Sequence, residues 1–166
     1  MKSVTCVLPY VGNQFLLQLR DFKGGIVYPG MWGFFGGSIF LNEEPRDSAF
    51  REIEEEIGLQ PPFLYFLGRF TIADLHDVES YTYFFPLSKN LSSLVLNEGA
   101  DFGLFSVDKI RTFSLYSQKY GKNFPVVPSE YVSAVLGQCQ TLIRNGIPKQ
   151  LIVRPKKMGS NTGKGV

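Results

Sequence analysis

The chain has 166 residues, enough for one domain with a hydrophobic core and too few for two domains of ordinary size. Hydrophobic residues make up 44% and charged residues 19%, a globular composition that excludes a largely disordered chain. The formal net charge of +2 is too small for attraction to a phosphate backbone to dominate binding, so we expect a small-molecule ligand and no nucleic-acid partner.

The N-terminal part predicts a hairpin followed by a long loop. Residues 4–9 and 14–20 are apolar, strand-like runs, and the Val-Gly-Asn sequence at 11–13 supplies the turn between them. Residues 24–37 mix glycines with aromatic side chains. We expect them to form a loop that enters a short strand ending at the glycine pair 36–37.

Residues 45–57 predict a helix with clear ends. Pro45 suits the first helical position and Gly58 suits a left-handed stop. At about 100° per residue, one arc of this helix is apolar and the adjacent arc carries three glutamates, while Glu54 lies on the other flank. The apolar arc consists of Ala49, Phe50, Ile53 and Ile57, and the acidic arc of Glu52, Glu55 and Glu56.

The second half of the chain predicts further strands and one long helix. Residues 63–72 and 79–87 are two aromatic strands joined by a polar turn. A loop around Asn97-Glu98-Gly99 leads to a strand at 103–106, which a short helix follows. Residues 130–144 predict an amphipathic helix capped by Ser129 that covers one face of the sheet. We expect one domain over residues 1–154 and a disordered basic and Gly-Ser tail over 155–166.

The acidic arc of residues 45–57 needs an explanation. Carboxylates at positions i, i+3 and i+4 repel one another, and each like-charge pair costs an isolated helix roughly 0.2 to 0.5 kcal/mol. A bound magnesium ion would compensate, because it prefers hard oxygen ligands and is commonly shared between carboxylates and substrate phosphates. Taken alone, the glutamates fit a solvated acidic helix face better than a metal site.

The spacing around those glutamates changes the interpretation. Gly37 is followed after five residues by Glu43, then after seven residues by Arg-Glu-Ile-Glu-Glu-Glu-Ile-Gly-Leu. This pattern over residues 37–59 resembles the Nudix signature at every specified position. The Pro-Gly-Met-Trp sequence at 29–32, Glu98-Gly99 and the Leu-Phe-Ser sequence at 104–106 resemble elements that flank the signature. The chain is therefore similar to Nudix hydrolases.

The resemblance implies a fold, a cofactor and a set of site residues. The fold would be an α/β/α sandwich with a mixed central sheet, and the cofactor Mg²⁺, with Mn²⁺ as an alternative. Carried over by position, the metal ligands would be Glu52, Glu55, Glu56 and the backbone carbonyl of Gly36. Arg51 would orient a carboxylate such as Glu43 rather than touch the substrate. Glu55 is the first choice for positioning or deprotonating the attacking water and Glu98 is its rival.

Substrate recognition is less well specified by the sequence. A nucleobase could stack on an aromatic ring, and the candidates are Trp32, Phe34, Phe35, Tyr81 and Tyr83, although a core role is the alternative for each of them. Arg20 could reach a phosphate, although a charge at the surface end of a strand is the alternative.

The expected reaction is magnesium-dependent hydrolysis of a pyrophosphate bond in a nucleoside diphosphate derivative. We favour a nucleoside triphosphate, native or oxidised, that is cut to a monophosphate and pyrophosphate. A nucleotide-sugar or ADP-ribose pyrophosphatase is the second hypothesis, and a catalytically silent nucleotide sensor is the third. The oligomeric state is open between a monomer and a homodimer.

The sequence also predicts where the protein resides. No stretch approaches the ~18 apolar residues of a membrane span, and the N-terminus lacks an apolar run of signal-peptide length. Cys6 and Cys139 lack CxxC spacing, which favours two core thiols in a reducing compartment over a disulfide. We therefore expect a cytoplasmic protein without membrane contact.

Overall fold

A computed structural model describes residues 2–76, 78–88 and 90–157 of the chain. Within these ranges the strands are β1 (Ser3–Val11), β2 (Gln14–Leu19), β3 (Trp32–Gly33), β4 (Leu64–Ile72), β5 (Val78–Pro86), β6 (Asp101–Ser106), β7 (Ser114–Ser117), β8 (Lys122–Pro125) and β9 (Ile152–Val153). The α-helices are α1 (Pro45–Ile57), α2 (Val107–Ile110) and α3 (Glu130–Asn145). Short 3-10 turns lie at Ala73–Leu75, Leu91–Ser93 and Lys149–Leu151.

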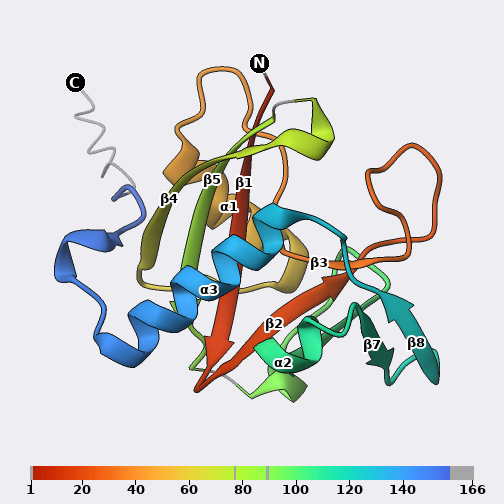
Figure 1. Ribbon diagram of the computed structural model, residues 1–166. Coiled ribbons are helices and arrows are strands. Elements are labelled where there is room, and N and C mark those ends of the chain that lie inside the picture. Colours follow the sequence, from red (N-terminus) through yellow and green to blue (C-terminus); the bar gives the residue numbers. More distant parts are fainter. Residues whose placement is uncertain (1, 77, 89, 158–166) are drawn as a thin grey trace, which may run out of the picture.

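The main sheet is mixed, as the resemblance predicted. Its strand order is β3-β2-β1-β5-β4-β9. Strand β6 lies outside this order and pairs with β2 from Gln14 to Leu19. The central pair of β1 and β5 is parallel, whereas the other pairs are antiparallel. Strands β7 and β8 form a separate hairpin, which Figure 1 shows at the lower right.

Strands β1 and β2 separate soon after their turn, and this separation creates the place for the site. They pair only where Tyr10 faces Phe15 and Val11 faces Gln14. Farther along, β1 is joined instead by the segment that enters α1, through isolated bridges at Phe35 and Ser38. Two glycines, Gly36 and Gly37, therefore run beside β1 just before the helix.

Two helices cover opposite faces of the sheet, which confirms the expected α/β/α sandwich. In Figure 1, α3 crosses in front of β1, β4 and β5, and α1 lies behind them. One buried cluster contains residues of α2 and α3, including Val135 and Cys139, and the other contains Ala49 and Ile53 of α1. None of the helices within the described ranges has the length and apolarity that a bilayer crossing requires.

The ends of α1 fall where the sequence predicted them. Pro45 occupies the first turn, and Gly58 adopts the left-handed conformation at φ 67° while its N–H donates to the carbonyl of Glu54. Ala49, Ile53 and Ile57 are buried. The predicted stripe therefore anchors α1 to the sheet, and the acidic arc follows from that rotation.

One part of the fold differs from the expectations. The β7–β8 hairpin, which turns at Gly121 with φ 64°, was not predicted. Of the expected disordered tail, residues 158–166 lie outside the described ranges. Residues 155–157 are described, and the Lys156 ammonium lies 2.7 Å from the carboxylate of Asp47 at the start of α1.

Candidate active site

Arg51 forms hydrogen bonds with several acidic residues of the signature. Its guanidinium donates to both carboxylate oxygens of Glu43, at 2.7 and 2.9 Å, and to Oε1 of Glu52 at 2.7 Å. It also donates to Glu55 at 3.1 Å and to the carbonyl of Ser38 at 3.1 Å. These hydrogen bonds lower the pKa of Glu43 and raise that of Arg51. The arginine therefore contacts three carboxylates of the signature, and Glu43 is the one that accepts two hydrogen bonds from it.

An aromatic ring covers one face of the Arg51 guanidinium. Its central carbon lies 4.0 Å from the centroid of the Phe40 ring. A cation over an aromatic face is stabilised by the ring quadrupole. Phe40 itself is 59% exposed, so it covers Arg51 from the solvent side.

Glu56 is the most deeply buried carboxylate of the site. Its side chain accepts a hydrogen bond from the backbone N–H of Gly36 at 2.8 Å and from the amide of Gln18 at 3.2 Å. Both donors are neutral, and no described Lys, Arg or His forms an ion pair with it. Because Glu56 is only 3% exposed, burial raises its pKa to about 8, and the nearby charge of Glu52 adds to the shift. A cation near Glu56 would stabilise its ionised form.

Glycine leaves the space that Glu52 and the adjacent backbone occupy. A Cβ atom on Gly37 would lie 2.6 Å from Oε1 of Glu52, and one on Gly36 would lie 2.0 Å from the carbonyl oxygen of Thr5. Burial raises the pKa of Glu52, whereas its hydrogen bond to Arg51 acts in the opposite direction. Gly37 therefore leaves room for the Glu52 carboxylate, and Gly36 leaves room for the backbone of β1 at Thr5.

The remaining acidic residues lie nearer to solvent. Glu55 is exposed and bonded to Arg51, and Glu54 is exposed on the other flank, where it accepts from Gln60. Glu98 is also exposed, and its charge contributes to the raised pKa values of Glu52 and Glu56. The Glu98 carboxylate therefore acts electrostatically on both buried carboxylates from a loop 42 residues after Glu56 in the sequence.

A cavity of about 430 Å³ adjoins this cluster. Gly36, Gly37 and Ser38 form part of its wall, so the backbone that contacts Glu56 and Glu52 also faces the cavity. The other lining side chains include Arg20, Tyr28, Phe34, Asp74, His76, Ser129 and Tyr131. Its volume falls within the ~300 to 1,000 Å³ of typical small-molecule sites.

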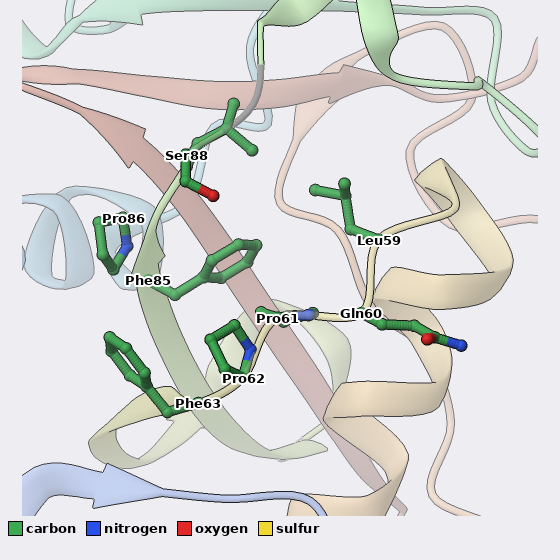
Figure 2. A pocket seen from close by; sticks show the side chains of 9 residues that line it. Leu59, Gln60, Pro61, Pro62, Phe63, Phe85, Pro86 and Ser88 are labelled. Atoms are coloured by element: carbon green, nitrogen blue, oxygen red, sulfur yellow. The ribbon is translucent and has the colours of Figure 1, made fainter.

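A second hollow lies beyond the C-terminal end of α1 and is smaller, about 170 Å³. Figure 2 shows its lining, which is dominated by Pro61, Pro62, Phe63, Phe85 and Pro86. None of its lining residues is charged. It therefore offers no group for acid-base or metal chemistry.

The structure does not favour stacking of a base on three of the predicted aromatics. Trp32 and Phe35 are 0% exposed and Tyr83 is 3% exposed. The indole N–H of Trp32 is already bonded to the carbonyl of Leu115 at 3.1 Å, and Tyr83 packs on Phe66. All three side chains lie in the core, so we do not retain them as base-stacking residues. Arg20 does line the cavity, and Phe34 and Tyr131 are among the aromatic residues that line it, together with Tyr28 and Phe35.

Sequence reasoning missed Gln18. It is 3% exposed and donates both to Glu56 and to the backbone carbonyl of Glu98 at 3.0 Å. The signal was available in the sequence, because Gln18 is the one polar residue within the apolar run at 15–19. A buried amide requires hydrogen-bond partners, and here those partners are site residues.

Comparison with known proteins identifies the family. A model of the NUDIX domain matches residues 1–126, most of the chain. The chain belongs to the NUDIX family. This is a family of hydrolases that generally use divalent metal cations and act on small nucleotide substrates.

Curated NUDIX relatives match over short stretches. An RNA pyrophosphohydrolase of Hydrogenovibrio crunogenus is 42% identical over 48 residues, which cover 29% of this chain and 29% of the relative. The nucleoside triphosphatase NudI of Escherichia fergusonii is 36% identical over 61 residues, 35% of this chain and 42% of the relative. The matched stretch thus spans less than half of each relative.

Solved NUDIX structures share the fold over most of the chain. A MutT NUDIX hydrolase from Burkholderia pseudomallei has a TM-score of 0.62 at 19% identity and covers 82% of this chain and 96% of that one. The NUDIX domain of Shewanella oneidensis NrtR, complexed with ADP ribose, has a TM-score of 0.60 at 15% identity, with 84% and 85% covered. At these identities the likeness shows the fold alone.

The donor atoms present suit a NUDIX metal. Glu52 and Glu56 are buried carboxylates with raised pKa values, and hard cations prefer such oxygen ligands. Of the three neighbouring carbonyls, those of Phe35 and Gly37 accept from Val7 and Thr5 of β1, while that of Gly36 does not pair with β1. No three acidic, His or Cys side chains of the described ranges converge into a complete metal cage. Magnesium needs none, since one or two carboxylates with waters and substrate phosphates commonly hold it.

Proposed function

We propose that this NUDIX protein hydrolyses a pyrophosphate bond of a nucleoside diphosphate derivative with magnesium, and that its substrate is a nucleoside triphosphate, native or oxidised. The products would be a nucleoside monophosphate and pyrophosphate. The observation that carries the proposal is Glu56, a carboxylate that is 3% exposed and held by neutral donors. Such a group calls for a cation, and it lies beside a cavity that can hold one nucleoside.

The residues of the site divide the work. Glu52, Glu55, Glu56 and the Gly36 carbonyl would hold Mg²⁺, with Mn²⁺ as a substitute. When bound, the metal neutralises phosphate charge and makes a bound water more acidic. Arg51 keeps Glu52 and Glu55 in place through its hydrogen bonds at 2.7 and 3.1 Å. Either Glu55 or Glu98 would take the proton of the attacking water, because both carboxylates are exposed beside the buried pair.

The cavity would take the nucleoside. Phe34 and Tyr131 pack edge to face in it with ring centroids 5.8 Å apart, and Arg20 supplies a positive charge. The glycine pair lies between this cavity and the carboxylates, so the phosphate chain would pass a stretch of wall without bulky side chains. A cavity sized for one nucleoside favours a triphosphate over an ADP-ribose or nucleotide sugar, whose second half needs a further subsite.

The test is a product-release screen over nucleoside triphosphates, oxidised triphosphates, ADP-ribose and nucleotide sugars with magnesium. Product masses would show which bond breaks. Glu56→Gln should lower kcat by about 10³-fold, because metal placement depends on its charge. The matched control is Glu54→Gln, which alters an exposed residue of the same helix and should stay within a few-fold of wild type.

Absence of turnover on the whole panel would contradict the proposal. If nucleotides nevertheless bound, the third hypothesis, a silent sensor, would replace it. Turnover of ADP-ribose or a nucleotide sugar in preference to every triphosphate would retain the reaction and reject the substrate.

A further inference from the structure

Gln18 occupies a position where the fold calls for an apolar side chain. Its neighbours on β2, Phe15, Leu16, Leu17 and Leu19, are all 0% exposed. Leu16 belongs to the buried cluster on the α1 side, and Gln18, two residues later in the strand, points to that side as well. A buried amide there must gain enough from hydrogen bonds to offset its desolvation.

The two hydrogen bonds of Gln18 join two separate parts of the site. One amide hydrogen of Gln18 is donated to Oε1 of Glu56 at 3.2 Å, and the other to the main-chain carbonyl of Glu98 at 3.0 Å. Glu56 belongs to α1, and Glu98 belongs to the loop before β6. The amide therefore fixes the Glu56 carboxylate and the Glu98 loop relative to each other.

The loop is shaped to accept this contact. Gly99 adopts φ +95°, and a Cβ atom there would lie 2.8 Å from the Gln18 side chain. The N–H of Asn97 donates to the main-chain carbonyl of Glu56 at 2.8 Å, so the loop also rests on the end of α1. On its far side, the Lys119 ammonium donates to the carbonyl of Ala100 at 2.9 Å.

We propose that Gln18 is a positioning residue, which holds Glu98 and Glu56 in one fixed arrangement for the hydrolysis described above. Neutral amide donors suit this role, because they orient the Glu56 carboxylate without removing the charge that a metal needs. The proposal rests on the proposed function, and it adds a contact from β2, outside the signature at residues 37–59. It does not require Gln18 to touch the substrate.

The test replaces Gln18 by Met, which has a similar length and no donor. Hydrogen exchange measured on the intact protein should become at least about 10-fold faster over residues 97–100 and stay unchanged in β4 and β5. With the substrate found in the screen, kcat should fall about 10-fold while KM stays within about twofold, because the loss concerns alignment and not binding. Gln14→Met is the matched control, since Gln14 is an exposed glutamine at the start of the same strand.

The two readouts separate the failure of this inference from that of the proposed function. Unchanged exchange over 97–100, or unchanged kcat, would overturn the role of Gln18. If the wild-type protein hydrolyses nothing in the screen, the proposed function fails, and the exchange result alone decides whether Gln18 anchors the loop. If Gln18→Met does not fold, Gln18→Asn replaces it in the test. Its amide is polar like that of Gln18, but its shorter side chain cannot reach both acceptors.

Discussion

Replacing Glu56 by Gln should stabilise the metal-free protein, and increasingly so as the pH rises. Burial raises the folded-state pKa of Glu56 from 4.5 to about 8. For a carboxyl group this direction means that the protonated form is favoured by folding. Stability is therefore highest below the unfolded pKa and is lost as the pH rises from about 4.5 through about 8.

The size of the effect follows from the shift. At about 1.36 kcal/mol per pKa unit, ionising Glu56 lowers the free energy of unfolding by about 1 kcal/mol at pH 5, about 3 at pH 7 and about 5 at pH 9. Gln keeps an acceptor for the Gly36 N–H but places an amide opposite Gln18, a mismatch that costs about 1 kcal/mol. The variant should therefore match wild type at pH 5 and exceed it by about 2 kcal/mol at pH 7 and about 4 at pH 9.

The assay is urea unfolding of both proteins in chelator at pH 5, 7 and 9, with equal m-values as the condition for comparing them. Glu54→Gln, on the exposed flank of α1, should stay within about 0.5 kcal/mol of wild type throughout. Adding magnesium should reduce the stability difference between Glu56→Gln and wild type, because the ion binds the folded wild-type protein. Two results would refute the assignment of Glu56 as a buried carboxylate without a cation. One is a Glu56→Gln variant that is no more stable than wild type at pH 9, and the other is a stability difference that does not change with pH.

Three further outcomes are expected. Hydrolysis should disappear in excess chelator and return with Mg²⁺ or Mn²⁺, and turnover that survives chelator would reject a metal-dependent site. Trp32→Ala should cost about 3 to 5 kcal/mol in urea unfolding, because the ring is 0% exposed, and a loss below 1 kcal/mol would remove it from the core. Gly37→Ala should lower kcat at least about 10-fold in a folded protein, because its Cβ would lie 2.6 Å from Oε1 of Glu52 and displace that carboxylate; a wild-type rate would show that Glu52 has freedom to move.

The parts of the fold that the sequence predicted are those with local causes. Helix α1 was predicted at both ends because Pro45 and Gly58 act on their own backbone, and the rotation of the helix then put Glu56 against the sheet and left Glu54 in solvent. The end of the chain's second long helix, at Asn145, differs by one residue from the expected 144. Such boundaries depend on residues that are neighbours in the sequence.

The parts that could not be predicted depend on contacts between distant segments. The first strand of the β7–β8 hairpin has one buried apolar residue, Leu115, so its sequence shows only a weak alternation of apolar and polar residues. Trp32, Phe35 and Tyr83 carry no local sign of which side of the sheet they face. For Phe35, that choice is made when the segment after β3 joins β1 instead of β2. Gln18 could have been singled out from composition, but its partners, 38 and 80 residues away, could not.

The short stretch of backbone at Gly36, Gly37 and Ser38 fixes the spacing between the cavity and the buried carboxylates. It separates the cavity from the buried carboxylates, and it has almost no side-chain atoms that could change its thickness. The distance from the bound nucleoside to the attacked phosphorus would then be set by main chain alone. Changes at Phe34 or Tyr131 would alter which base is accepted and leave the position of the cut in the phosphate chain unchanged.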